Sequence, residues 1–182
     1  MKVEERIAEL LARFRDLCPE AVVEAGPANS PVRPELREVL NNWLDHFPFL
    51  QADAGYIAFL HACSSACAFC PDQNIHIELA GVLQFEDQLA NSGFPRHADR
   101  WYCIGSSSVC LRRIGDQANS VSHGFYFDET GQHPWGVYHV SDWDHGRPRS
   151  KHRRIANDFV EFLEMLVACK GNPNTDVADA NG

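Results

Sequence analysis

The spacing of apolar residues changes twice along this chain, and the two changes restrict its fold class. Over the first third, apolar residues recur at helical spacing, as Ile7, Leu10 and Phe14 do. Short aromatic and β-branched runs follow, beginning with the alternating segment Ile75–Leu79, and a last helical stripe starts at Phe159. Helices followed by closely spaced strands and one more helix predict an α+β fold. Short connections favour a mostly antiparallel sheet of about five to six strands, with the C-terminal helix packed on the sheet.

Turn-forming and capping residues divide this pattern into elements. Pro19 ends the first helix, Pro48 ends the second, and Asp53 is a suitable N-cap for the third. The predicted helices cover about residues 7–17, 34–47, 53–66 and 158–170. The predicted strands are Ile75–Leu79, Trp101–Ile104, Val109–Ile114, Phe125–Phe127 and Val137–Val140, with a polar turn at Gly115–Ser122.

The length of 182 residues predicts one domain, with short additions at both ends. Residues 1–25 are predicted to form an N-terminal helical extension, which the Gly- and Pro-rich segment 26–31 separates from the rest. Residues 34–170 make up the predicted α+β domain. The tail 171–182 contains no aromatic residue and one β-branched aliphatic residue, so it is predicted to be disordered.

The charge balance is acidic and uneven, which bears on the class of partner. The chain has 16 Lys and Arg against 25 Asp and Glu, a formal net charge of −9. Without the five cations of one short segment, the balance is 11 against 25, or −14; these are Arg147, Arg149, Lys151, Arg153 and Arg154. An acidic body repels phosphate backbones, which argues against nucleic-acid binding and suits a basic protein partner.

Hydropathy, the N-terminus and cysteine usage predict the cellular location. No apolar run approaches the roughly 18–20 residues needed to cross a bilayer, and the N-terminus lacks the pattern of a secretory signal. The seven cysteines are odd in number, which favours reduced thiols over a disulfide framework. A cytoplasmic protein with no membrane partner is therefore expected.

The spacing Cys63-x₃-Cys67-x₂-Cys70 is the sharpest chemical pattern in the sequence. Three thiolates can hold zinc or an iron–sulfur cluster, and His61 and His76 flank them. The three cysteines also follow one stripe of the predicted third helix, where thiols pack as small hydrophobic groups. We therefore expect a buried thiol row and no cofactor, with a metal site as the alternative.

The segment after the last predicted strand is the expected binding region. It combines Trp143 with two acids, Asp142 and Asp144, and such residues supply contact area and steering charge for a basic protein. The predicted partner-binding residues are Trp135, Asp142, Trp143, Asp144, Arg147 and Arg149. Two alternatives remain open. One is a solvated turn whose basic run pairs with acids such as Asp128, and the other is a metal or acid–base site made by Asp142, Asp144 and His145.

The remaining histidines give no catalytic pattern. His97, His123, His133 and His152 fall singly in predicted loops, and none has the spacing of a metalloprotease or a nucleophile triad. The sequence also lacks a phosphate-binding glycine loop. No enzymatic activity is therefore predicted.

Several aromatic motifs occur in a characteristic order. They are Tyr56–Leu60, with the pattern Y-x-x-F-L, the strand Trp101–Gly105, the strands Phe125–Asp128 and Val137–Ser141, and the helix start Ile155–Leu163. In this order they resemble the SUKH superfamily over about residues 34–166. The resemblance implies a non-catalytic α+β domain that binds another protein. Many bacterial members of the family look like immunity proteins, and some eukaryotic relatives act as regulatory scaffolds.

The resemblance thus predicts an immunity protein that neutralises a toxin by stoichiometric binding, and the acidic charge balance suits a basic toxin domain. A fold alone does not decide between the roles found in one family. A regulatory scaffold of the same fold is one alternative. A small zinc or iron–sulfur protein that uses Cys63, Cys67 and Cys70 is the other.

Overall fold

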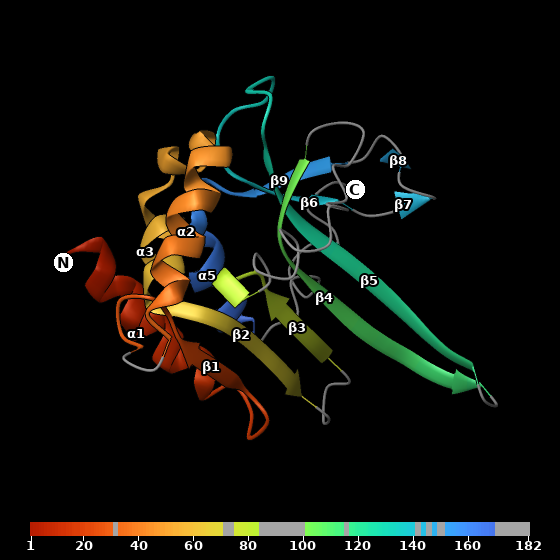
Figure 1. The fold of residues 1–182 in the computed structure, drawn as a ribbon. Helices are drawn as coiled ribbons and strands as arrows, with labels where there is room; N and C mark the ends of the chain where they lie inside the picture. The colour runs from red at the N-terminus through yellow and green to blue at the C-terminus, as the bar shows by residue number, and fades with distance from the viewer. Residues whose placement is uncertain are drawn as a thin grey trace.

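The computed structural model describes residues 1–30, 33–70, 75–83, 101–114, 117–140, 143–144, 147–148 and 152–169 (Figure 1). The helices are α1 (Val3–Arg15), α2 (Glu35–His46), the 3₁₀ helix η1 (Pro48–Ala52), α3 (Ala54–Ala62) and α5 (Phe159–Ala168). The strands of the main sheet are β1 (Val22–Ala25), β2 (Cys63–Cys70), β3 (Ile75–Leu79), β4 (Trp101–Ile114), β5 (Gln117–Asp128), β6 (Val137–Val140) and β9 (His152–Ala156). The short strands β7 (Trp143–Asp144) and β8 (Arg147–Pro148) pair with each other.

The main sheet has seven strands in the order β1-β2-β3-β4-β5-β6-β9. Every neighbouring pair is antiparallel. The predicted α+β class is therefore confirmed, with seven strands in the sheet rather than about five to six. The strands β4 and β5, of 14 and 12 residues, form a hairpin that extends beyond its neighbours (Figure 1).

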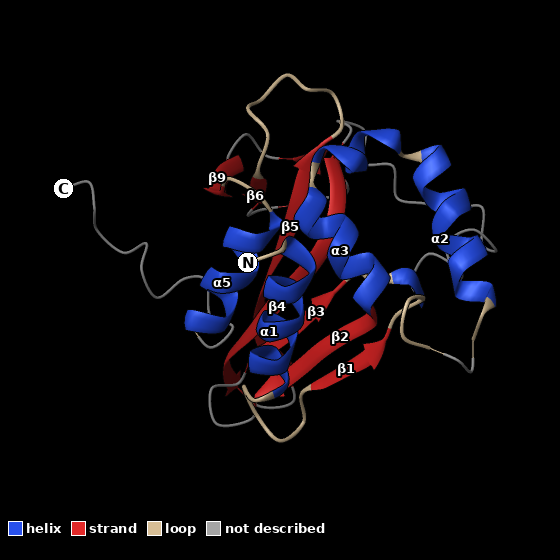
Figure 2. Ribbon diagram, turned by 90° about the vertical axis from the view of Figure 1, so that its left-hand side faces the viewer, coloured by secondary structure: helices blue, strands red, loops and turns tan. Residues whose placement is uncertain are grey.

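Helices α1, α3 and α5 pack against one another and cover one face of the sheet (Figure 2). Alternation along β3 turns Ile75, Ile77 and Leu79 toward the core, and all three are buried. Aromatic rings fill the centre of this layer. The ring of Tyr56 on α3 lies 5.0 Å from that of Phe159 on α5 and 5.3 Å from that of Phe127 on β5.

The first 25 residues share this core. Ile7, Leu10 and Phe14 of α1 are fully buried in one cluster with Phe159. The guanidinium of Arg6 donates a hydrogen bond of 2.7 Å to Glu164 on α5, and β1 forms the edge of the sheet. The segment predicted as an N-terminal extension is therefore built into the same domain as the rest. No helix within the described ranges is both long and apolar enough to cross a membrane.

Several predicted boundaries of helices and strands are wrong, because runs of small residues show neither the apolar spacing of a helix nor the alternation of a strand. The third helix ends at Ala62 rather than near residue 66, and Cys63–Cys70 forms β2. Gly105 and the serines after it do not stop the strand that begins at Trp101. A Cβ on Gly105 would lie 2.6 Å from the carbonyl oxygen of Glu78, so glycine permits the close approach of β3 and β4. Residues 117–122, predicted as a turn, belong to β5, and the sequence prediction lacks β1 and β9.

Candidate functional site

The structure describes some of the predicted partner-binding residues fully, others by their backbone alone, and others not at all. Trp135 is half-buried, with its ring stacked 4.9 Å from Phe127 and its indole N–H donating 3.2 Å to Asp53 Oδ2. These contacts give Trp135 a packing role. The backbones of β7 and β8 place Trp143 opposite Pro148 and Asp144 opposite Arg147. Asp142, His145 and Arg149 lie outside the described residues, so their partner-binding or metal-binding role stays a prediction.

The predicted thiol row on a helix is wrong. Cys63, Cys67 and Cys70 all lie on β2, where neighbouring side chains alternate between the two faces of the sheet. Cys70 is buried together with Ala66 and Ala68, whereas Cys67 is only partly buried and faces the other way. The three thiols therefore do not converge on one point.

The surroundings of Cys63 do not activate its thiol as a nucleophile. Burial raises the pKa of the thiol to about 12, and Sγ donates a hydrogen bond of 3.1 Å to the carbonyl oxygen of Ser65. A free thiol in this state is neutral at physiological pH, and the thiolate is the reactive form. Within the described part of the chain, no three His, Cys, Asp or Glu side chains are arranged to hold a metal ion.

Asp53 is a buried carboxylate that joins three elements. Its Oδ1 accepts the Tyr56 N–H at 2.9 Å and so caps α3, as the sequence predicts. Its Oδ2 accepts the first N–H of α5, from Phe159, at 3.0 Å, and the indole N–H of Trp135. Burial raises the pKa of Asp53, and the three hydrogen bonds oppose that rise. All three of these contacts are internal, so the arrangement is structural.

A cluster of polar and aromatic side chains lies where β5, β6 and β9 meet. Asp128, the last residue of β5, accepts hydrogen bonds from the N–H and hydroxyl of Thr130 at 2.7 and 2.6 Å. It also accepts the backbone N–H and ring Nδ1 of His133, both at 2.8 Å. The Nε2 of His133 lies 3.0 Å from Nε2 of His152, the first residue of β9. The sequence prediction treats both histidines as isolated loop residues.

The described residues also show the partners of Asp128, an acid predicted to pair with the basic run of residues 147–154. Among the described residues it bonds to Thr130 and His133. A pairing with Arg147, Arg149 or Lys151 stays a prediction, because their side chains lie outside the described part of the chain. Arg154 instead donates to the backbone carbonyl of Trp135. Burial alone would raise the pKa of Asp128, but the four hydrogen bonds outweigh burial, and the pKa lies below its ordinary value.

Replacing Asp128 by asparagine is expected to destabilise the protein by about 2 kcal/mol at pH 7, because two donors from His133 lose a charged acceptor. A folded-state pKa below the unfolded value means that the carboxylate stabilises the fold above the unfolded pKa. This contribution is lost as pH falls through the folded pKa. The difference from wild type should therefore shrink below about pH 4. Urea denaturation at pH 7, 5 and 3 measures it, with the exposed Asp16→Asn as the control. A difference that grows toward acid pH would contradict this assignment.

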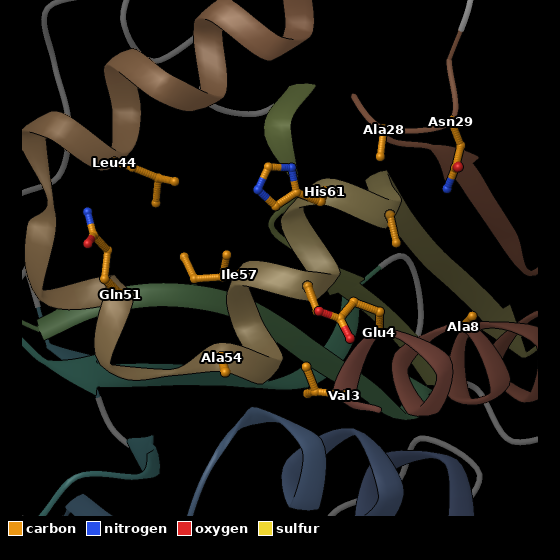
Figure 3. A pocket seen from close by; sticks show the side chains of 12 residues that line it. Val3, Glu4, Ala8, Ala28, Asn29, Leu44, Gln51, Ala54, Ile57 and His61 are labelled. Atoms are coloured by element: carbon orange, nitrogen blue, oxygen red, sulfur yellow. The ribbon is translucent and has the colours of Figure 1, made fainter. Parts of the chain in front are cut away.

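A groove opens between α1, α2 and α3, with a volume of about 670 Å³. Five of its twelve lining residues are alanines, and these short side chains leave the space open. In Figure 3, Leu44 of α2 faces Ile57 and His61 of α3 across the cavity. Glu4 of α1 is the one acid among the described residues that line it. The volume and the mostly apolar lining are typical of a site that receives a small ligand or an apolar side chain.

Comparison of the chain with protein-family models, with curated proteins and with solved structures found no match. The function therefore has to be argued from the fold, the groove and the cluster around His133.

Proposed function

We propose that this chain is a non-catalytic protein-binding domain of the SUKH type, which acts as an immunity protein and neutralises a toxin by stoichiometric binding. The observation that carries the proposal is the groove between α1, α2 and α3. Its apolar lining suits an apolar anchor side chain of the partner, since anchors that fill a pocket dominate the free energy of binding at interfaces.

The charge distribution supports a basic partner. Glu4 lines the groove, and the chain as a whole carries a net charge of −9. Complementary charge accelerates encounter between partners and helps to exclude acidic competitors. A basic toxin domain with an exposed apolar side chain fits both features of this surface.

The residues behind the family resemblance support the fold part of the proposal. Tyr56, Phe59, Ile104, Phe159 and Phe162 are all fully buried. Residues of this kind specify how helices pack on a sheet. Because they are buried, they cannot determine which partner binds, so the binding surface has to be tested directly.

The test is titration calorimetry between the full chain and the toxin domain encoded next to its gene. A 1:1 complex is expected. Ala8→Trp should weaken it at least about 30-fold, because the indole would occupy the groove, and that loss corresponds to the roughly 2 kcal/mol of an interface hot spot. Ala12→Trp is the matched control: Ala12 is also exposed on α1, one turn further along, and is not part of the groove lining.

Each result of this titration decides a separate claim. Equal affinities of Ala8→Trp, Ala12→Trp and wild type would exclude the groove as the binding site. Absence of any complex between wild type and the neighbouring toxin domain, together with no protection of cells that express that toxin, would overturn the proposed function.

A further inference from the structure

The pair His133 and His152 has the geometry of two ligands to one ion. Their Nε2 atoms are 3.0 Å apart, and two imidazole nitrogens bound to the same metal at about 2.0–2.1 Å also lie roughly 3 Å apart. The ring centroids are only 4.5 Å apart, with 74° between the planes. If the two rings pointed straight at each other through their Nε2 atoms, the centroid separation would be the N–N distance plus the distance from each centroid to its Nε2. That sum is larger than the 4.5 Å between the centroids. The two rings are therefore not collinear, and their Nε2 atoms lie close enough together for one ion to contact both.

Asp128 favours the tautomer of His133 that a metal ligand requires. The carboxylate accepts a hydrogen bond at Nδ1, which assigns the proton of the neutral ring to Nδ1 and leaves the lone pair on Nε2. A carboxylate behind a histidine is the usual second-shell partner of a metal ligand, because it fixes both tautomer and ring orientation. Asp128 is itself held by three further hydrogen bonds from Thr130 and His133, so the ring has little freedom to turn.

Aromatic side chains form the floor beneath the pair. The indole of Trp101 stacks on His133 at 5.3 Å and lies 5.0 Å from His152. Tyr138 packs against Trp101, and both residues are buried. An apolar support restricts solvent on one side of the rings and strengthens metal–ligand interactions there. His152 is exposed and His133 partly exposed, which leaves the other side open to an incoming ion.

We propose that His133 and His152 form a two-histidine site for a divalent transition-metal ion such as zinc, with Asp128 as the residue that positions His133. Imidazole is a preferred ligand of zinc, copper and nickel, and water would complete the coordination. With two protein ligands, and with the cationic Arg153 and Arg154 following His152 on β9, the site should bind more weakly than a closed structural zinc site. This inference does not depend on the proposed toxin-binding function.

The test is calorimetric titration of Zn²⁺ alone into the tag-free full chain at pH 7.5. One ion per chain is expected, and His152→Ala and His133→Ala should each weaken binding at least about tenfold, since loss of even a second-shell partner has effects of this size. The matched control is His76→Ala, which removes an exposed histidine of β3. Circular dichroism checks that each variant is folded.

The role of Asp128 needs a second measurement. Asp128→Asn should weaken Zn²⁺ binding by about tenfold. It should also release His133 from the Nδ1–H tautomer, which the ¹⁵N chemical shifts of the imidazole ring report without metal. An unchanged tautomer would refute the positioning role. Binding of Zn²⁺ by His152→Ala as tight as by wild type, no binding by wild type, or equal weakening by His76→Ala would overturn the metal site.

Discussion

Replacing Asp53 by alanine is expected to lower the free energy of unfolding by about 3 kcal/mol. The substitution removes the N-cap of α3 and leaves three donors without their acceptor: the buried N–H groups of Tyr56 and Phe159 and the part-buried indole N–H of Trp135. A lost cap costs about 1 kcal/mol, and each buried donor without a partner adds to this. The melting temperature should fall by roughly 10 °C. Urea denaturation and calorimetry measure both quantities.

Asp158→Ala is the matched control for Asp53→Ala. Asp158 is also a helix N-cap, since its carboxylate accepts the Glu161 N–H at 2.8 Å, but it is exposed, and among the described residues its side chain bonds only within its own helix start. Its loss should cost about 1 kcal/mol. If the two substitutions destabilise the protein equally, Asp53 acts as an ordinary cap and does not tie the helices together.

Phe159→Ala is expected to have the largest effect on stability, a loss of about 4 kcal/mol. The ring is fully buried, lies 4.9 Å from Phe59 and 5.0 Å from Tyr56, and fills the contact between α3 and α5. Truncation removes this apolar contact and leaves a cavity that the neighbouring side chains can fill only in part. Chemical denaturation at pH 7 gives the change directly.

Phe69→Ala is the matched control, because it removes the same phenyl ring from a more exposed position. Phe69 lies on β2 with half of its surface exposed, 50 %, so the same truncation removes little buried area. We expect a change below about 1 kcal/mol. Comparable losses for Phe159→Ala and Phe69→Ala would mean that the α3–α5 contact contributes little to the core.

The sequence predicts those features that depend on short-range pattern. Ile7, Leu10 and Phe14 have helical spacing and form the buried face of α1, and the alternation of Ile75–Leu79 gives β3. Asp53 is predicted from its position as a cap, and it accepts the expected backbone N–H. Asp53 shows the limit of this reasoning. Its second oxygen binds Phe159, a residue 106 positions away, and no local pattern encodes that contact.

The errors have two physical causes. Small residues fit helix and strand equally well, so the run from Cys63 to Cys70 reads as a continuation of the helix although it forms β2. The cluster around His133 depends on β9, an exposed edge strand whose charged side chains hide any alternation. The pairing of β6 with β9, in which Val140 lies opposite His152, brings His152 beside His133. The groove likewise forms between three helices, and no single segment contains it.

The order of strands in the sheet has a consequence for how the protein folds. From β2 to β6 each strand pairs with the next in sequence, and pairings between neighbouring segments form quickly. A nascent chain can therefore extend this sheet strand by strand as it leaves the ribosome. The helical layer cannot close in the same way, because the Phe159 N–H has to reach Asp53 across 106 residues. We therefore expect the apolar face of the sheet to stay partly uncovered until α5 is synthesised, and the docking of this helix to protect the newly made chain from aggregation.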